Sequence, residues 1–418
     1  MKTPRYRIAM YSPGMVGFGH IRRNASIAQA LCCSPLKPAI VMIAEARQAG
    51  ALPMPQGVDC VTLPALRKEA DGWIKPRFLD VDEQDLIALR AKVISRAIKT
   101  FDPDLFIVDH LPLGAARELV RTLTRLRRHG RTRCVLGLRD ILQDPKTVYT
   151  RWSEQGNRDA IHEFYDAIWI YGDPAVYDPV REYGIFLEVA NKVRYTGYLD
   201  QRPRLKFAEA HAAQLLADLP PGRLALCAVG GGNDGVELAD AFVRAHLPPA
   251  TTGLVVTGPY MPRKARQNLR RMIQKRPHFR LLEFVPEPAP LINRAERVIA
   301  MGGYNTMCEV LSFEKHALIV PRVKPNLEQW IRAERMRNLG MVHVLHPDKL
   351  SPRALTEWLA RDLGPAPEGR SRVDFHGLDR IPGLLAQLLG DITRPAGRAA
   401  SLLSALFAFL AGGSVMPV

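Results

Sequence analysis

The stretch Arg297-Val-Ile-Ala-Met-Gly-Gly-Tyr-Asn-Thr306 joins an aliphatic run to a pair of glycines and then to the helical pattern Met307–Phe313. A short apolar run without alternation is typical of a strand buried on both faces, and glycines let the backbone turn sharply into a helix. The N–H groups of such loops and helix N-termini bind anionic oxygens. This unit therefore predicts an α/β fold with an anion site at the end of a strand.

Two further loops of this kind follow apolar runs elsewhere in the chain. Leu224–Val229 leads into Gly230-Gly-Gly-Asn-Asp-Gly235, and Tyr6–Tyr11 leads into Ser12-Pro-Gly-Met-Val-Gly-Phe-Gly-His20. A single glycine pair would do no more than turn the chain. Three such loops, each directly after a predicted strand, favour phosphate binding at the carboxyl ends of parallel strands.

The chain repeats an apolar run, a loop with Gly or Pro and a helical stretch, which is typical of parallel sheets covered by helices on both faces. Strands are expected at residues 6–11, 40–44, 104–109, 134–138, 168–171, 224–229, 253–257, 280–283, 298–301 and 317–320. A length of 418 residues suits two such domains. We predict two Rossmann-like α/β domains, 1–200 and 201–393, a hinge at 197–204 and an apolar tail at 394–418. The last helical segments, 352–361 and 378–389, could pack on either domain.

The formal net charge of +16 favours an anionic partner. No helix-turn-helix, zinc-finger or RNA-binding motif accompanies that charge, so nucleic acid is not expected as the partner. The six cysteines form no CxxC pair, which indicates buried free thiols in a reducing compartment. No secretory signal precedes the first strand, so we expect a cytoplasmic protein. No pair of aspartates stands where a metal would be expected, and we predict neither a metal nor another cofactor.

Two segments bear on a membrane surface. Arg117–Arg133 contains seven arginines, four of which share one helical face. A solvated face is the ordinary interpretation, and contact with an anionic membrane is the alternative. The tail Ala399–Val418 carries no charge, but its glycines and Pro417 limit any helix to about 14 residues, too few to span a bilayer. We expect a docking helix or a loose tail there, with an anchor on the inner membrane face as the alternative.

Several motifs together resemble the inverting glycosyltransferases of the GT-B fold. They are Gly17-Phe-Gly-His-Ile-Arg-Arg-Asn24, Tyr171-Gly-Asp-Pro174, Tyr195-Thr-Gly-Tyr198, Met301-Gly-Gly-Tyr-Asn-Thr306 and the stretch Pro321–Gly340. Within that fold the chain is similar to family 28, which includes the bacterial N-acetylglucosaminyltransferase of peptidoglycan precursor synthesis, and to a group of bacterial predicted glycosyltransferases. The resemblance runs from residue 5 to about residue 350. It implies two Rossmann-like domains that face a cleft, with the donor nucleotide on the second domain.

The resemblance also implies which residues bind the donor, a nucleotide sugar whose leaving group is expected to be UDP. The backbone at Val285 would meet the uracil, and Glu309 would hold the ribose hydroxyls. Glu328 and Gln329 would meet the hydroxyls of the donor sugar. Residues of the glycine loops would line the diphosphate: Gly231, Gly232, Gly302, Gly303, Asn305 and Thr306.

The two donor carboxylates also have structural interpretations. Thr306-x-x-Glu309 has the spacing of a capping box, in which the glutamate bonds to the start of its own helix. Glu328 follows Pro325-Asn326, a candidate N-cap, and an acid in the first turn complements the helix dipole. The dipole does not account for the adjacent Gln329, and we favour ligand binding for both carboxylates.

His20 is the predicted general base. It stands in a glycine loop before a helix, whose N-terminus keeps an imidazole neutral, and the family places a catalytic or acceptor-facing histidine at this position. Asp109 or His110, directly after a predicted strand, could serve instead, and Asp109 could equally be a helix N-cap. On the acceptor side of the cleft we expect Gly17, Gly19, Asn24 and His110.

We therefore expect an inverting transfer of a hexosyl or N-acetylhexosaminyl group to a hydroxyl acceptor. The loop after His20 departs from the family 28 pattern, so the acceptor (lipid-linked, polysaccharide or small molecule) is not specified. Two alternatives stay open: a UDP-sugar 2-epimerase of the same fold, and a non-catalytic protein that binds anions or membranes. A dehydrogenase is a weaker alternative. Glu45 follows the second strand as a ribose-binding acid would, but Gly14-x-x-Gly17-x-Gly19 reverses the dinucleotide motif.

Overall fold

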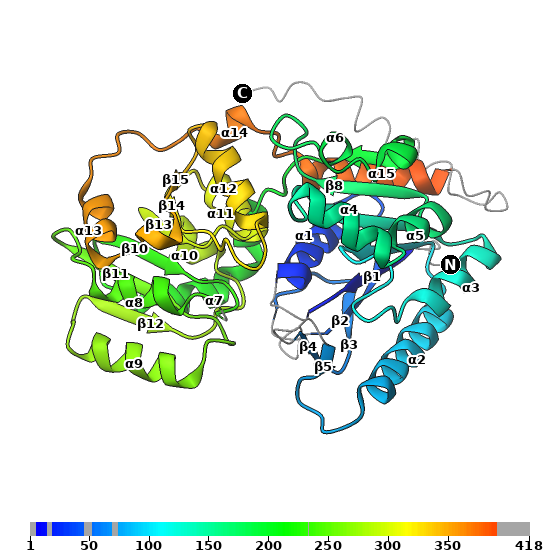
Figure 1. The fold of residues 1–418 in the computed structure, drawn as a ribbon, viewed down its shortest axis with the longest axis horizontal. Helices are drawn as coiled ribbons and strands as arrows, with labels where there is room; N and C mark the ends of the chain where they lie inside the picture. The colour runs from blue at the N-terminus through cyan, green and yellow to red at the C-terminus, as the bar shows by residue number, and fades with distance from the viewer. Residues whose placement is uncertain (1–5, 15–18, 46–51, 69–73, 233, 391–418) are drawn as a thin grey trace.

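The computed structural model describes residues 6–14, 19–45, 52–68, 74–232 and 234–390. Two lobes lie side by side, each built around its own parallel sheet (Figure 1). The central strands are buried on both faces, as their aliphatic sequences require. The predicted α/β architecture of two Rossmann-like, parallel-sheet domains is confirmed.

The first lobe contains a seven-stranded sheet in the order β3-β2-β1-β6-β7-β8-β9, with every neighbouring pair parallel. Its strands are β1 (Arg7–Ser12), β2 (Ala39–Ala44), β3 (Val58–Thr62), β6 (Leu105–Asp109), β7 (Arg133–Arg139), β8 (Ala167–Tyr171) and β9 (Val193–Tyr195). A short antiparallel pair consists of β4 (Leu66–Lys68) and β5 (Ile74–Pro76). The helices are α1 (Gly19–Cys33), α2 (Glu83–Phe101), α3 (Val120–His129), α4 (Pro145–Glu154), α5 (Asn157–Phe164), α6 (Pro179–Tyr183) and the 3-10 helix η2 (Leu187–Lys192).

The second lobe contains a six-stranded parallel sheet in the order β12-β11-β10-β13-β14-β15. Its strands are β10 (Arg223–Ala228), β11 (Thr251–Val256), β12 (Phe279–Leu282), β13 (Arg297–Ala300), β14 (His316–Ile319) and β15 (His343–Val344). Around and after it come η3 (Arg202–Arg204), α7 (Leu205–Ala217), α8 (Val236–Arg244), α9 (Arg263–Gln274), α10 (Ala289–Arg294), α11 (Tyr304–Ser312), α12 (Glu328–Asn338), η4 (Pro347–Lys349), α13 (Pro352–Ala360), α14 (Gly369–Arg372) and α15 (Gly377–Gly390).

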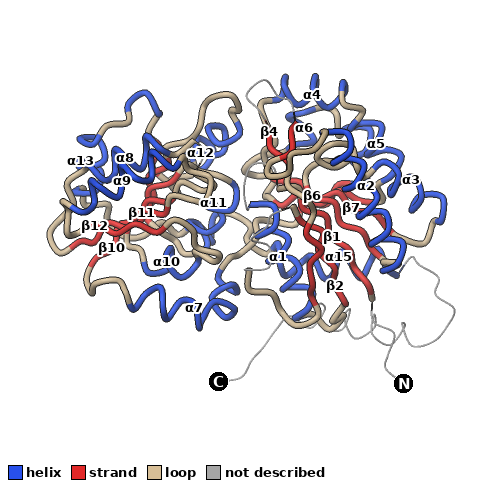
Figure 2. Tube along the Cα trace, turned by 90° about the horizontal axis from the view of Figure 1, so that it is seen from below, coloured by secondary structure: helices blue, strands red, loops and turns tan. Residues whose placement is uncertain are grey.

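Successive strand residues point to opposite faces, so each sheet has an apolar layer on either side. In β1, Ile8 and Met10 join a cluster with α1 and α15, whereas Ala9 and Tyr11 join a cluster with α2 and α3. In the second lobe α8 and α9 cover one face of the sheet, and α7 and α10 cover the other (Figure 2). The helices thus leave the carboxyl ends of the strands for the loops.

All ten predicted strands are present within two residues of their expected bounds. The strands that are missing from the prediction are short or lie at the edge of a sheet. β4 and β5 have three residues each, and β3, β9 and β15 are edge strands. β3 (Val-Asp-Cys-Val-Thr) is only half-buried, so it lacks the continuous aliphatic run that marked the central strands.

The end of the chain returns to the first lobe (Figure 1). α15 packs against α1, and its buried Leu378, Ile381 and Leu385 join the apolar cluster that contains Ile8 of β1. The predicted second domain, 201–393, had included this helix, so that assignment is wrong for 377–390. The predicted boundary near residue 200 stays a prediction.

Three remaining expectations concern the termini and the thiols. The predicted tail at 394–418 lies outside the described residues. No helix in the described part of the chain has both the length and the apolar character needed to cross a bilayer. All six cysteines are free thiols; Cys134, Cys227 and Cys308 are buried as expected, whereas Cys33 is exposed at the end of α1.

Candidate active site

One cavity of ≈ 260 Å³ lies between the two lobes, at the carboxyl ends of the central strands. The strand order reverses direction at β1 and at β10. After β1 the chain adds β2 and β3 on one side and then β6 on the other; after β10 it adds β11 and β12 on one side and then β13 on the other. Ligands of parallel sheets bind at such switch points. The first lobe lines the cavity with Gly19, His20, Arg22, Arg23 and Arg139. From the second lobe come the loops after β10, β11, β13 and β14 and the first turns of α11 and α12.

The glycine loops of the second lobe stand where the sequence predicted. Gly232 adopts φ +94°, and a Cβ there would lie 2.2 Å from the Thr257 carbonyl oxygen, so no other residue fits this turn. Gly303 is the N-cap of α11. The cavity is lined by Gly231, Gly232, Val285, Gly303, Asn305 and Thr306. Gly302 stands at the turn between β13 and α11, with φ +78°. Their contacts with a donor stay predictions.

Glu309 is buried in α11 and faces the cavity. α11 begins at Tyr304 with Gly303 as its N-cap, so Thr306 lies inside the helix and the capping-box interpretation of Glu309 is wrong. The carboxylate instead accepts a hydrogen bond from Nη2 of Arg22 in the first lobe. The predicted contact of Glu309 with the donor ribose stays a prediction.

Glu328 opens α12 and lies in a buried cluster of charges. It accepts hydrogen bonds from Arg139 of the first lobe at 2.7 Å and from Arg332, one turn along α12, at 2.8 Å. These cations lower the pKa of Glu328, although burial by itself would raise it. Leu327, and not Asn326, is the N-cap of α12. The adjacent Gln329 also lines the cavity, and its Oε1 accepts from the Arg322 N–H at 2.9 Å.

His20 and Asp109 form a buried pair beside the cavity. Nδ1 of His20 lies 2.6 Å from Oδ2 of Asp109, and Arg23 donates to both oxygens of the same carboxylate, at 2.7 and 2.6 Å. Because the carboxylate accepts from Nδ1, Nε2 is the ring nitrogen that can take a proton. Asp109 ends β6 and no described helix begins at it, so its N-cap interpretation is wrong. It lies behind His20, fully buried, and not on the cavity surface.

Burial sets the protonation state of this group. It lowers the pKa of His20 below its ordinary value, and the negative charge of Asp109 opposes that shift without cancelling it. Burial would raise the pKa of Asp109, but Arg23 and His20 hold it below its ordinary value. At neutral pH the arrangement is therefore a neutral imidazole on an ionised carboxylate, which is the state a general base requires.

The residues predicted to meet the acceptor do not all lie at the cavity. Gly19 lines the cavity, whereas Gly17 lies outside the described residues. His110, at φ +69°, is not among the residues that line the cavity, and its ring centre lies 5.2 Å from that of His20, with the two rings tilted by 32°. Burial, with the nearby positive charge of Arg139, holds the pKa of His110 well below its ordinary value. Asn24 is fully buried and donates to Ser12 Oγ at 2.6 Å. It therefore ties α1 to β1, and this structural role replaces the predicted acceptor contact.

The acid that could have bound a nicotinamide ribose is occupied within the protein. Glu45 is buried and accepts from the Gly14 and Leu66 N–H groups, and it lies 3.4 Å from Arg90. Glu45, the residue on which the dehydrogenase alternative depended, therefore has a structural role.

The cavity residues that the sequence did not predict include three arginines and a tyrosine: Arg22, Arg23, Arg139 and Tyr304. Arg139 is the last residue of β7, so the rule that ligands meet the carboxyl ends of strands could have found it. Arg22 and Arg23 follow His20 directly in the first turn of α1. The guanidinium carbons of Arg23 and Arg332 lie 5.4 and 5.6 Å from the ring centre of Tyr304. Arg23 belongs to the first lobe and Arg332 to the second, so only the packing of the two lobes brings these cations to one ring.

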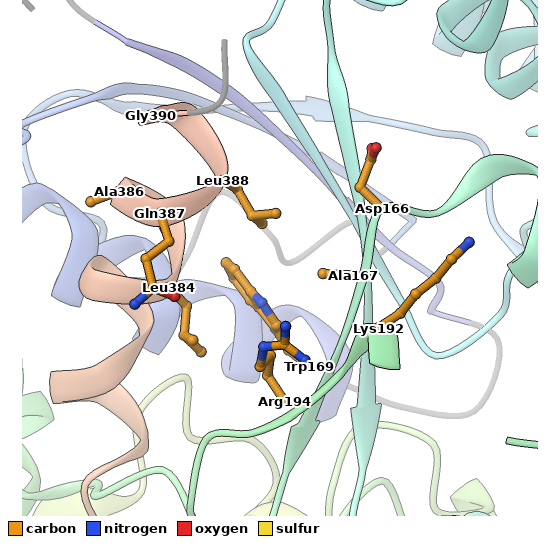
Figure 3. Close-up of a pocket in the computed structure, with 10 residues that line it drawn as sticks. All are labelled: Asp166, Ala167, Trp169, Lys192, Arg194, Leu384, Ala386, Gln387, Leu388 and Gly390. Carbon is orange, nitrogen blue, oxygen red and sulfur yellow. The ribbon is translucent and has the colours of Figure 1, made fainter. Parts of the chain in front are cut away.

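Other parts of the described chain offer no comparable constellation. Among the described residues no group of three or more His, Cys, Asp or Glu could hold a metal ion. A second cavity of ≈ 440 Å³ lies beside β8, β9 and α15, where Trp169, Leu384 and Leu388 line it with Asp166 and Lys192 (Figure 3). Asp166 and Lys192 directly precede β8 and β9, so this cavity lies at the amino ends of these strands, whereas the glycine loops lie at the carboxyl ends of the strands they follow.

Comparison with known proteins bears mainly on the second lobe. Residues 227–369 match the glycosyltransferase family 28 C-terminal domain. This range contains the glycine loop after β10, all of α11 and the Glu328-Gln329 pair. No curated protein matches the chain at a significant level.

Solved structures resemble the whole chain in fold. The glycotransferase of kitacinnamycin superposes with a TM-score of 0.61 at 15% identity, covering 93% of this chain and 100% of its own. MurG of Acinetobacter baumannii gives 0.55 at 13% identity, with 92% and 100% covered. UDP-GlcNAc 2-epimerase of Neisseria meningitidis, bound to UDP-GlcNAc, gives 0.59 at 12% identity, with 92% and 99% covered. The predicted GT-B fold is thus confirmed, and at these identities the likeness extends to the fold alone.

The pKa of His20 should be measurable by NMR titration of its ring resonances, assigned with a His20→Gln variant. We expect a midpoint below about 6.5, and a still lower one in Asp109→Asn, because removal of the carboxylate charge disfavours the imidazolium. Since the unfolded chain then binds this proton more tightly than the folded one, His20 should lower stability as pH falls below about 6.5. A midpoint that rises in Asp109→Asn would contradict the pairing.

Proposed function

We propose that this chain of the GT-B fold, whose residues 227–369 match the glycosyltransferase family 28 C-terminal domain, is an inverting hexosyl- or N-acetylhexosaminyltransferase. Its donor is a nucleotide sugar, and UDP is the leaving group. One observation carries the proposal. A histidine whose Nδ1 is fixed by a buried carboxylate faces, across one cavity, the glycine loops and buried acids of the family 28 domain.

His20 is the proposed base. As the acceptor oxygen attacks C1 of the donor sugar, a new C–O bond forms and the bond from C1 to the diphosphate oxygen breaks. The electron pair leaves with the nucleoside diphosphate, and the acceptor proton passes to Nε2 of His20. Asp109 keeps the ring oriented and stabilises the imidazolium that results, and Arg23 keeps Asp109 ionised. Attack from the face opposite the leaving group inverts the configuration at C1.

The second lobe would hold the donor. The N–H groups after Gly303, at the N-terminus of α11, and those of Gly230–Gly232 are placed to stabilise the charge that develops on the departing diphosphate. Glu309 would accept from the ribose hydroxyls, while Glu328 and Gln329 would bind the sugar. No metal and no other cofactor enters this scheme.

A panel of labelled nucleotide sugars tests the proposal. We expect one UDP-linked hexose or N-acetylhexosamine to be consumed, with release of UDP through transfer or slow hydrolysis, and mass spectrometry of the products to show it. Conversion of the donor to its 2-epimer would support the epimerase alternative. If calorimetry detects no binding of any nucleotide or nucleotide sugar, both enzymatic proposals fail.

Two variants separate binding from chemistry. His20→Ala should leave the affinity for UDP nearly unchanged and lower kcat by about 10²–10⁴-fold, the usual contribution of a general base. Glu309→Ala should weaken UDP binding about tenfold, because a charged acceptor of hydrogen bonds is lost. Calorimetry and initial rates report the two quantities. An equal loss of UDP affinity in both variants would mean that His20 binds the donor and is not the base.

We also propose that the protein works at the cytoplasmic face of an anionic membrane, through a basic groove between α2 and α3. Ser95, Lys99, Arg121, Thr124, Arg125, Arg128 and His129 line this groove, without an acidic residue. The side chains of its four Lys and Arg residues have no ion-pair partner among the described residues, so their charges are available to lipid phosphates. The other predicted arginines behave differently: Arg117 bonds to the Gln155 carbonyl and Arg131 pairs with Asp102.

Vesicle sedimentation tests the basic groove. The protein should bind vesicles that contain phosphatidylglycerol and phosphatidylcholine more tightly than vesicles of phosphatidylcholine alone. The triple variant Arg121→Glu/Arg125→Glu/Arg128→Glu should abolish that difference, because each cation near the surface contributes about 1 kcal/mol of attraction to an anionic membrane. A matched control, Arg263→Glu/Lys264→Glu/Arg271→Glu on α9, changes the net charge equally at exposed positions. Equal loss in both triple variants would contradict a specific membrane face.

A further inference from the structure

The carboxylate assigned to the donor ribose is already paired, and its partner comes from the other lobe. Nη2 of Arg22, in the first turn of α1, donates to Oε1 of Glu309 in α11. Both side chains are largely buried, 19% and 2% exposed, and both line the interdomain cavity. Arg22 is the one cation that bonds to this carboxylate within the described part of the chain.

This pairing conflicts with ribose binding. Two vicinal ribose hydroxyls would each bond to one carboxylate oxygen, and Arg22 already occupies one lone-pair site of Oε1. The cavity between the lobes is also small, ≈ 260 Å³, against about 300–1,000 Å³ for typical ligand pockets. A nucleotide that enters therefore competes with the Arg22 side chain both for Glu309 and for space in the cavity.

The displaced guanidinium needs a new anion. It stays charged at every accessible pH. Its other acidic neighbour is Glu287, whose Oε1 lies 3.9 Å away and whose Oε2 already neutralises Arg204 at 2.7 Å, so one carboxylate would face two guanidinium groups. The nucleoside that takes over Glu309 is neutral. Of the parts of the donor, only the diphosphate can balance the charge, because a buried unpaired arginine is strongly unfavourable.

The backbone geometry places that diphosphate within reach. The Gly19 carbonyl, three residues before Arg22, accepts a hydrogen bond from Asn305 Nδ2 at 2.6 Å, so the first turns of α1 and α11 touch. The diphosphate site proposed at Gly303–Thr306 is about one helical turn, roughly 6 Å, from Glu309 along α11. The proposed exchange therefore requires the Arg22 guanidinium to move by about one helical turn along α11.

On the basis of the function proposed above, we propose that Arg22 is a diphosphate-binding residue that the first lobe contributes to the donor site, and that it exchanges Glu309 for the donor phosphates when the ribose binds. Glu328 does not undergo the same complete exchange. Arg332 holds it from its own helix, so release of Arg139 leaves that carboxylate still paired. Arg22 thus distinguishes a nucleoside diphosphate from a nucleoside.

Comparison of UDP with uridine tests the exchange. In Arg22→Ala, UDP should bind about tenfold or more weakly, because a charged hydrogen bond to phosphate is lost. Uridine should bind equally well or better, because no ion pair has to break before the ribose reaches Glu309. Arg22→Lys, which keeps a point charge, should recover part of the UDP affinity. Calorimetry measures UDP, and ligand-observed NMR measures the weaker uridine.

Arg202→Ala is the matched control, since Arg202 is a half-exposed arginine paired with Asp200 near the hinge. It should change neither affinity, and circular dichroism should show that each variant is folded. Equal weakening of UDP and uridine in Arg22→Ala would make Arg22 a mere tether between the lobes and overturn the proposal, as would unchanged UDP binding. If the unmodified protein binds UDP but transfers no sugar, the proposed function fails while the exchange stands; if it binds neither ligand, both fail.

Discussion

Buried charges between the lobes must all be paired, and this constraint governs the rest of the structure. Arg332 of α12 is fully buried and bonds to Asp140 of the first lobe at 2.7 Å, while Tyr198 donates to the same carboxylate at 2.8 Å. Arg204 pairs with Glu287 within the second lobe and also donates to Gln29 Oε1 of the first lobe at 3.0 Å. Removal of one partner would leave an uncompensated charge at a cost of about 3–5 kcal/mol, so the two lobes are held in one relative orientation.

That orientation assembles the site. His20 and Asp109 lie within one lobe, but the glycine loops and Glu309 that face them belong to the other. The same arginines that neutralise the cavity carboxylates hold the lobes together, so a donor that binds those carboxylates acts on the interface as well. In the proposed exchange, donor binding rearranges ion pairs: the ribose hydroxyls replace Arg22 at Glu309, and the phosphates receive its guanidinium. Such an exchange keeps every buried charge paired and therefore avoids a large desolvation penalty.

Local sequence patterns predicted some helix starts and side-chain contacts wrongly. The spacing Thr306-x-x-Glu309 fits a capping box, but the helix starts three residues earlier, because Gly303 provides its N-cap. Asn24 belongs to the polar motif that follows His20, yet its amide lies inside α1 and holds that helix against β1. The observed helix starts differ from the expected ones by one position at α12 and by three at α11. Such a shift decides whether a polar group faces ligand or backbone.

The sequence by itself determined the central strands of the two sheets and the glycine loops at their carboxyl ends, and with them the positions of His20 and Glu309. These features depend on short-range rules: aliphatic runs that need two covered faces, and glycines that alone permit the turns. Only the tertiary structure decided that Arg22 meets Glu309, 287 positions away, and that α15 returns to the first lobe. No periodicity encodes such partners, because a charge pairs with whatever opposite charge the packed lobes bring within reach.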